Sequence, residues 1–151
     1  MCAVIASLGA CAGSAPSNRR GEISLQEGDL FAYQSVGGIA DQETTVHVAL
    51  DGSATERFRW ISDPIIVTSV TIPAASIEEL RAEIAQADLQ KLAGTYLCSD
   101  RGITCNDTPL ETLLIPSDGA VREITFEDRG GLPAQLQAIG DDVYEIVEQI
   151  K

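Results

Sequence analysis

The feature that most constrains the fold is a pair of alternating segments joined by Asp51 and Gly52. In residues 44–50 and again in residues 54–61, apolar and polar side chains alternate along the chain. This period of two is typical of β-strands with one face turned to the core. An Asp-Gly pair between two such segments is the strongest short signal for a hairpin. The sequence therefore predicts an antiparallel hairpin over residues 44–61.

Three further β-rich regions surround this hairpin. The first, residues 30–36, ends at a Gly-Gly pair, and the second, residues 65–72, is bounded by Pro73. Another Asp-Gly pair, Asp118-Gly119, joins two apolar segments and predicts a second hairpin. The strands of this second hairpin are expected at residues 110–115 and 120–126.

Helical patterns follow the strands. Ser76 and Glu79 have the spacing of a capping box, which predicts a helix that runs to about Leu92 and ends at Gly94. Near the C-terminus, we expect Pro133 to start a short helix and Asp141 to cap a final one. The final helix carries a narrow apolar stripe of Val143, Ile146, Val147 and Ile150.

These elements predict an α+β fold: an antiparallel sheet of about four to six strands, with two or three helices packed on one face. We expect residues 30–151 to form a single domain. Residues 11–29 are predicted to be a flexible linker that begins at a modified cysteine, because they are rich in Gly, Ser and Pro. Residues 1–10 are interpreted as a truncated signal peptide.

The chain is strongly acidic, with 10 Lys and Arg against 23 Asp and Glu and a net charge of −13. This charge repels phosphate groups, so we expect no nucleic acid partner. The acidic residues are spread along the chain, which is typical of a solvated surface. We predict a monomer that needs no cofactor.

Cys98 and Cys105 are separated by six residues that include turn-forming Ser99, Asp100 and Gly102. In an exported protein such a pair most simply forms a disulfide. Zinc is a poor alternative, because it prefers four Cys or His ligands and the only histidine lies far away in the sequence. A calcium site at Asp100, Asn106 and Asp107 is conceivable, but the spacing favours a solvated loop.

The N-terminal segment Leu8-Gly9-Ala10-Cys11 follows a short apolar stretch. It resembles the lipobox of bacterial lipoproteins, which implies cleavage before Cys11 and lipidation of its thiol. The stretch lacks the Lys or Arg of a complete signal peptide, and the alternative is an ordinary N-terminus. The resemblance implies a protein held in the cell envelope by its lipid alone, facing the periplasm or the exterior.

No catalytic constellation stands out. His47 is the sole histidine, and a paired or solvent-facing strand histidine is the favoured interpretation. The chain has no nucleophile-elbow, phosphate-loop or zinc-helix motif. We therefore predict that the protein is not an enzyme and holds no metal, and an enzyme that uses acidic residues alone is the least favoured class.

The order of elements from residue 30 to residue 150 resembles the emfourin family of protealysin inhibitors. The resemblance is carried by the Gly-Gly loop, the first Asp-Gly hairpin and two short motifs, Ile77-Glu78-Glu79-Leu80 and Thr112-Leu113-Leu114-Ile115. It implies an α+β domain that blocks a thermolysin-type metallopeptidase through Gly37, Gly38 and Ile39. Ile39 stands where the family pattern has an aromatic residue, and the Cys98 and Cys105 pair is not part of that pattern.

The expected function is therefore that of an exported, lipid-anchored domain that binds a protein, with inhibition of a metallopeptidase as its specific form. The alternative is a structural or ligand-binding envelope lipoprotein without inhibitory activity.

Overall fold

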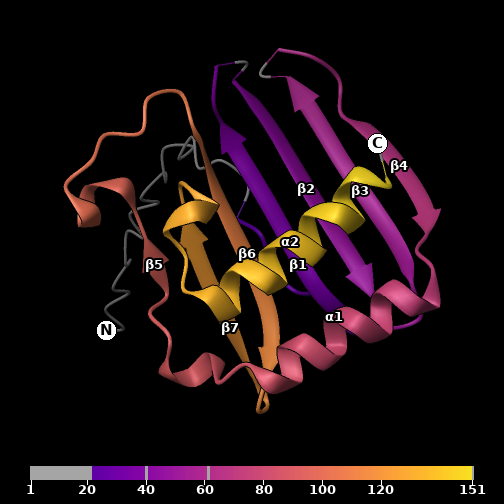
Figure 1. The fold of residues 1–151 in the computed structure, drawn as a ribbon. Coiled ribbons are helices and arrows are strands. Elements are labelled where there is room, and N and C mark those ends of the chain that lie inside the picture. Colours follow the sequence, from indigo (N-terminus) through magenta and orange to yellow (C-terminus); the bar gives the residue numbers. More distant parts are fainter. Residues whose placement is uncertain (1–21, 40, 61, 151) are drawn as a thin grey trace, which may run out of the picture.

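The computed structural model describes residues 22–39, 41–60 and 62–150. Seven strands form one sheet in the order β4-β3-β2-β1-β6-β7-β5, and all neighbours are antiparallel except β5 and β7 (Figure 1). The strands are β1 (Asp29–Gly37), β2 (Gln42–Ala49), β3 (Ser53–Trp60), β4 (Ile66–Thr71), β5 (Thr95–Tyr96), β6 (Pro109–Ser117) and β7 (Ala120–Phe126).

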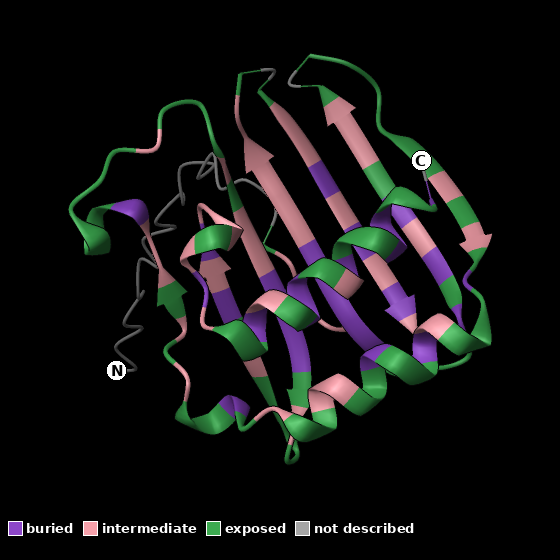
Figure 2. Ribbon diagram, in the orientation of Figure 1, coloured by how far each residue is buried: buried purple, intermediate pink, exposed green. Residues whose placement is uncertain are grey.

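Two α-helices, α1 (Ala74–Gln86) and α2 (Ala134–Glu148), cover one face of this sheet (Figure 1). Buried residues concentrate between the helices and the strands beneath them (Figure 2). Because side chains alternate along a strand, each strand sends every second residue into this core. The fully buried side chains include Phe31, Val46, Val48, Leu80, Ile115, Ile124, Ile139 and Ile146.

The α+β architecture agrees with the prediction, but the expected sheet of four to six antiparallel strands was wrong. The sheet has seven strands and is mixed, because Thr95 and Tyr96 pair in parallel with Thr125 and Phe126. A two-residue strand is too short to show alternation, so the sequence carries no signal for it. The structure has two α-helices, supplemented by short 3₁₀ turns.

The first hairpin forms where Asp51-Gly52 predicted it, and Gly52 is required there. Its φ is +86°, and a Cβ at this position would lie 2.7 Å from the carbonyl oxygen of Ile72. The Gly52 carbonyl also accepts a hydrogen bond of 2.8 Å from the Ile72 amide. The turn therefore fixes the end of β4 and the start of α1 beneath the sheet.

Both helices differ from their predicted limits. Pro73, and not Ser76, occupies the N-cap of α1, and the helix ends at Gln86 before a 3₁₀ turn at Leu89–Lys91. Proline suits the start of a helix because its missing amide is not needed there. The prediction of a helix running to Leu92 was wrong.

The two predicted C-terminal helices are one helix, α2, which continues through Gly140 and Asp141. A glycine inside a helix costs about 1 kcal/mol relative to alanine. Burial of Ile139 and Val143 on either side offsets this cost, since each buried aliphatic side chain contributes about 1.5–3 kcal/mol. Tertiary packing therefore overrides the local signals for a break.

Candidate functional site

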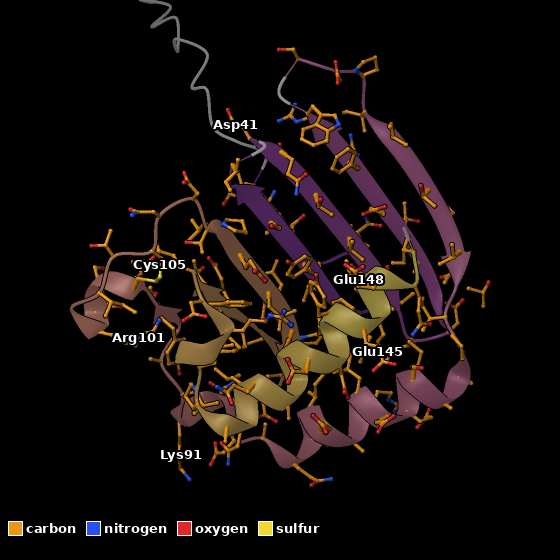
Figure 3. The ribbon with its side chains drawn as sticks, turned by 45° about the horizontal axis from the view of Figure 1, so that its top comes forward. Asp41, Lys91, Arg101, Cys105, Glu145 and Glu148 are labelled. Carbon is orange, nitrogen blue, oxygen red and sulfur yellow. A yellow bond between two sulfur atoms is a disulfide. The ribbon has the colours of Figure 1, made fainter. Side chains whose placement is uncertain are left out.

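The predicted binding residues form the turn between β1 and β2, at one end of the sheet. Gly37 and Gly38 both have positive φ angles, +95° and +78°, which an L side chain rarely adopts. Ile39 follows and is 87% exposed. The Asp41 amide donates to the Gly38 carbonyl at 3.1 Å, which closes the turn. Figure 3 shows Asp41 at this free end of the hairpin. The two glycines therefore present an apolar side chain to solvent on a hydrogen-bonded turn.

Gly38 packs against the segment that leads from the disulfide into β6. A Cβ on Gly38 would lie 3.5 Å from the Asp107 carbonyl oxygen and 3.7 Å from the Pro109 ring. Pro109 is also the strand partner of Gly37. The hairpin turn is therefore supported on one side by the residues that follow Cys105.

Further exposed apolar side chains surround this turn. Trp60 is 42% exposed, and its strand partner Gln42 is also the partner of Gly37. The Trp60 ring meets the Phe58 ring edge to face, with centroids 5.4 Å apart. We call the exposed apolar residues at this end of the sheet the apical rim. It comprises Ile39, Trp60, Ile65, Ile66 and Leu110.

The sheet face away from the helices is polar at its centre, although Ala32 and Leu114 on the same face are buried. Its central residues Gln34, Thr45, His47, Thr55 and Arg57 lie on neighbouring strands and line a hollow of about 430 Å³. Glu22, Ile23, Ser24 and Gln26, which belong to the predicted linker, also line this hollow. A volume of this size falls within the range of small-molecule sites. We call this surface the open face.

Two charged pairs lie on the open face. His47 Nδ1 is 2.8 Å from Asp29 Oδ2, and Arg59 Nε donates to Glu43 at 2.8 Å. The Asp29 carboxylate also accepts a hydrogen bond of 2.8 Å from the Gln26 amide. His47 is therefore a paired strand histidine, as the sequence interpretation favoured. Arg57 is exposed and makes no ion pair with any residue that the structure describes.

A second polar cluster lies on the opposite face of the sheet, around the buried side chain of Tyr33. The Tyr33 hydroxyl donates to Glu111 at 2.9 Å. Burial and the nearby Glu111 charge raise the pKa of Tyr33 far above its usual value. Burial also raises the pKa of Glu111, although the Tyr33 hydrogen bond and the Arg129 charge act in the opposite direction. The Arg129 guanidinium lies 4.1 Å above the centre of the Tyr144 ring. Arg129 therefore lies near Glu111 of β6 and also contacts Tyr144 of α2.

Acidic residues meet where α1 faces α2. Burial, followed by the charges of Glu83, Glu79, Glu145 and Asp141, raises the pKa of Asp142 to about 6. Within the described chain, one buried carboxylate oxygen of Asp142 and one of Glu83 have no hydrogen-bond partner. Repulsion between these carboxylates opposes the packing of the two helices at neutral pH.

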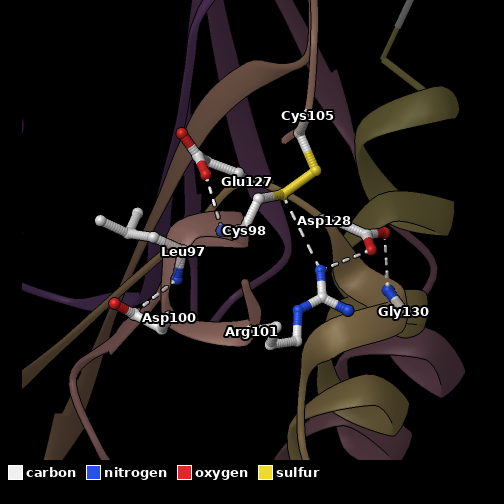
Figure 4. Close-up of a disulfide and its surroundings, with 8 residues drawn as sticks. All are labelled: Leu97, Cys98, Asp100, Arg101, Cys105, Glu127, Asp128 and Gly130. Atoms are coloured by element: carbon white, nitrogen blue, oxygen red, sulfur yellow. Dashed lines mark hydrogen bonds and ion pairs between the residues drawn. A yellow bond between two sulfur atoms is a disulfide. The ribbon is translucent and has the colours of Figure 1, made fainter. Parts of the chain in front are cut away.

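Cys98 and Cys105 form a disulfide, with Cα atoms 5.8 Å apart, in accordance with the prediction (Figure 4). The adjoining turn is tied to the end of β7, because the Cys98 amide donates to Glu127 at 2.8 Å. Arg101 pairs with Asp128 at 2.9 Å, and its hydrogen bond lowers the pKa of that carboxyl. The disulfide therefore holds the segment that supports the hairpin turn.

The predicted site residues are only partly brought together. Gly37, Gly38 and Ile39 form one turn, and the segment after Cys105 reaches it, whereas Cys11 lies outside the described residues. The sequence analysis missed the Asp29–His47 and Tyr33–Glu111 pairs. The alternation of β1 and β2 could have placed Asp29 and His47 on one face, but nothing local connects Tyr33 with Glu111.

Comparison with known proteins adds no assignment: no protein-family model matches the chain, and no curated protein sequence matches it. In the described part of the chain, no three His, Cys, Asp or Glu side chains are arranged to hold a metal ion. None of the described helices has both the length and the apolar character to cross a bilayer.

Proposed function

We propose that this protein is an exported, lipid-anchored domain that binds another protein through its apical rim and inhibits a thermolysin-type metallopeptidase. The observation that carries the proposal is the Gly37-Gly38 turn, which holds Ile39 out into solvent at the end of a seven-stranded sheet. Several exposed large apolar side chains at one end of a sheet are typical of an interaction surface.

The proposed mechanism is steric. Gly37 and Gly38 carry no side chains, so they can adopt positive φ angles and their backbone can approach the wall of a peptidase cleft. Pairing of Gly37 with Gln42 and Pro109 holds the turn in place from both sides. A turn held in this way occupies the substrate position at little cost in conformational entropy.

The rim also fits a protein partner in its composition. Trp60 and Ile39 are of the types that contribute most to interface cores, where large side chains become fully desolvated. Ile65, Ile66 and Leu110 extend the apolar surface on either side. The acidic charge of the remaining surface steers cationic partners toward the domain and excludes anionic ones.

The test is to titrate the folded domain against a thermolysin-type peptidase and measure peptide hydrolysis. We expect inhibition by the native domain and at least a tenfold loss of potency in Ile39→Asp, because a charge would be buried in the contact. Leu50→Asp is the matched control, since Leu50 is an equally apolar, exposed residue at the opposite end of β2. Unchanged hydrolysis with micromolar native domain would exclude the inhibitory function.

Trp60 provides a direct report on binding at the rim, because it is the only tryptophan in the chain. A partner that covers the rim desolvates the indole ring, and its fluorescence shifts to shorter wavelength. The Leu50→Asp variant should give the same shift as the native domain, and Ile39→Asp a smaller one. A partner that binds without any change in Trp60 emission binds elsewhere.

A second candidate function is the binding of a small ligand on the open face, as in an envelope lipoprotein without inhibitory activity. The hollow of about 430 Å³ and the exposed guanidinium of Arg57, which makes no ion pair with a described residue, favour a ligand that carries a carboxylate or phosphate group. Calorimetric titration with a panel of small anions tests it. Binding that is lost in Arg57→Ala but retained in Ile39→Asp would assign the function to the open face.

The proposed anchor is tested separately, on protein isolated from cells. Mass spectrometry should find diacylglycerol on Cys11 at the mature N-terminus, and a Cys11→Ser variant should leave the membrane fraction. An unmodified Cys11 in the cell-derived protein would exclude lipid anchoring. It would not bear on protein binding by the apical rim, which the Ile39→Asp variant tests.

A further inference from the structure

The sheet ends on one side in β4, whose outer edge lacks a strand partner among the described residues. β4 pairs with β3 from Ser53↔Thr71 to Phe58↔Ile66 without a register shift. Four of its six residues are exposed, and Ile66 and Val67 are 58% and 60% exposed (Figure 2). A regular strand with free amide and carbonyl groups on one side is a template for pairing with another strand.

This edge also lacks charge, in a chain whose net charge is −13. Residues 64–77 contain no Asp, Glu, Lys or Arg, and β4 itself consists of Ile, Val, Thr and Ser. Natural sheets protect exposed edges with charged residues, proline, bulges or very short strands. Residues 66–71 show none of these protections.

The opposite edge of the same sheet is protected. β5 has only two residues, Thr95 and Tyr96, and the chain turns at once into the 3₁₀ turn that carries the disulfide. Arg101 and Asp128 form an ion pair beside it. The two edges therefore differ: only β4 offers a strand-length surface for another chain.

We propose that β4 pairs antiparallel with β4 of a second copy of this chain and forms a two-fold symmetric dimer with a continuous sheet. This inference does not depend on the proposed function, and it departs from the monomer expected from the sequence. A second copy is the occupant that the charge pattern favours. Two copies that meet at β4 bring uncharged segments together and keep their acidic surfaces apart, whereas contact elsewhere brings carboxylates together.

The strand is also complementary to itself. In an antiparallel pair, residues of the same face lie opposite each other, so Val67 of one copy meets Ser69 or Thr71 of the other on the open face. The two helix layers then lie on the same side of the joined sheet. This contact is isologous and uses the β4 edge of both copies, so assembly stops at two. Because a six-residue strand covers less than the about 1,200 Å² of a stable interface, the dimer should be concentration-dependent.

The experiment measures the molar mass of the full chain by sedimentation and light scattering at increasing concentration. Cys2→Ala and Cys11→Ala are included in every sample so that no intermolecular disulfide forms. We expect the mass to rise from 16.0 kDa toward twice that value. The rise should be steeper in 0.15 M than in 0.01 M salt, because the Debye length falls from about 30 Å to about 8 Å and the repulsion between copies is screened.

Val67→Lys should abolish this rise, because a lysine on an edge strand opposes pairing with another strand and adds like charge to both copies. The matched control is Val121→Lys, since Val121 is 56% exposed and lies on the same face of the sheet in β7. Hydrogen exchange on the unsubstituted strand gives a second measurement. The amides of Ile66–Thr71 should exchange more slowly at high concentration, and those of the β6–β7 turn should not change.

A mass that stays at 16.0 kDa at all concentrations and in both salts would overturn the inference. A dimer that survives Val67→Lys, or one that leaves hydrogen exchange in β4 unchanged, would overturn it equally, because the copies would then meet at another surface. Loss of peptidase inhibition by Ile39→Asp with an unchanged dimer would leave the inference intact, since the two tests act on different residues.

Discussion

On the face covered by the helices, β2 presents Val46 and Val48, both fully buried, while the same strand presents Thr45 and His47 on the open face. The two faces are built by the same strands and share every backbone hydrogen bond. They differ in what lies against them: α1 and α2 on one side, and solvent with residues 22–26 on the other. Apolar side chains are stabilised where other residues exclude water, as for Val46 and Val48 on the helix-covered face and for Ala32 and Leu114 on the open face.

Both faces carry paired ionisable groups. On the open face, Asp29 and His47 form a largely buried pair, with side chains 6% and 16% exposed, and the Gln26 amide also donates to the Asp29 carboxylate. On the helix-covered face, the half-buried carboxyl of Glu111 accepts a hydrogen bond from Tyr33 and lies near the charge of Arg129. The main apolar core therefore lies on the helix-covered face, whereas the open face and the apical rim carry exposed groups that are available for binding.

The largest expected effect comes from the core. Ile139→Ala should lower the free energy of unfolding by about 2–5 kcal/mol, because it removes buried methyl groups and leaves a cavity. Thr55→Ala on the open face should change it by less than about 0.5 kcal/mol. Urea unfolding of both variants measures the difference. Similar losses in the two variants would contradict the contrast between the faces.

The disulfide should contribute the next largest effect. Replacing Cys98 and Cys105 together by serine should cost about 2.5 kcal/mol, because the short loop is no longer closed in the unfolded chain. The substitution also releases the segment that supports Gly38. The double variant should therefore inhibit the peptidase less potently than Thr55→Ala does. Thermal unfolding and inhibition assays on the same samples check both expectations.

A smaller effect is expected at the buried hydroxyl of Tyr33. Tyr33→Phe removes the hydrogen bond to Glu111 and leaves that carboxyl without its donor, at a cost of about 1–2 kcal/mol. Tyr96→Phe is the control, because Tyr96 is a half-buried tyrosine on the same sheet for which no side-chain hydrogen bond is found. An equal loss in both variants would show that Tyr33 acts by packing alone.

The smallest effect is a pH dependence. The pKa of Asp142 is raised from 3.8 to about 6 in the folded protein, so the folded state binds a proton more tightly than the unfolded state. Stability should be greatest below about pH 4 for this group and fall as the pH rises to about 6. We expect a change of about 1 kcal/mol, since solvent screens this partly exposed group.

Asp142→Asn should flatten this part of the pH profile, whereas Thr55→Ala should leave it unchanged. Burial also raises the pKa of Glu111, so Glu111 adds to the fall in the same direction. Unfolding measured in urea between pH 4 and pH 7 tests the sign. A stability that rises across this window in the native protein, without any change in Asp142→Asn, would contradict the proposed repulsion between α1 and α2.

The hairpins and the alternation of β1 to β4 could be predicted because their signals are local. Asp51-Gly52 marks a turn that needs a positive φ, and period-two alternation follows from the geometry of each strand. The apical turn was found for the same reason, through Gly37 and Gly38. The predicted helix limits were less accurate. Whether a helix starts after Pro73 or continues through Gly140 depends on tertiary packing, which the neighbouring residues do not define.

The contacts between distant residues could not be predicted in this way. Tyr33 and Glu111 are 78 residues apart, and their pairing depends on the register between β1 and β6. The parallel addition of β5 likewise depends on where the chain returns after α1. Such contacts carry no sequence period, so only the assembled fold reveals them.

The sequence alone determined the α+β class, the hairpins, the acidic surface and the cysteine pair, because each follows from the preferences of residues close together in the chain. Only the tertiary structure decided that seven strands join one sheet, that Trp60 lies beside the Gly37-Gly38 turn, and that β4 is left as an uncharged edge. The order of strands in a sheet is set by packing between distant segments, and that packing depends on how the whole chain buries its apolar surface.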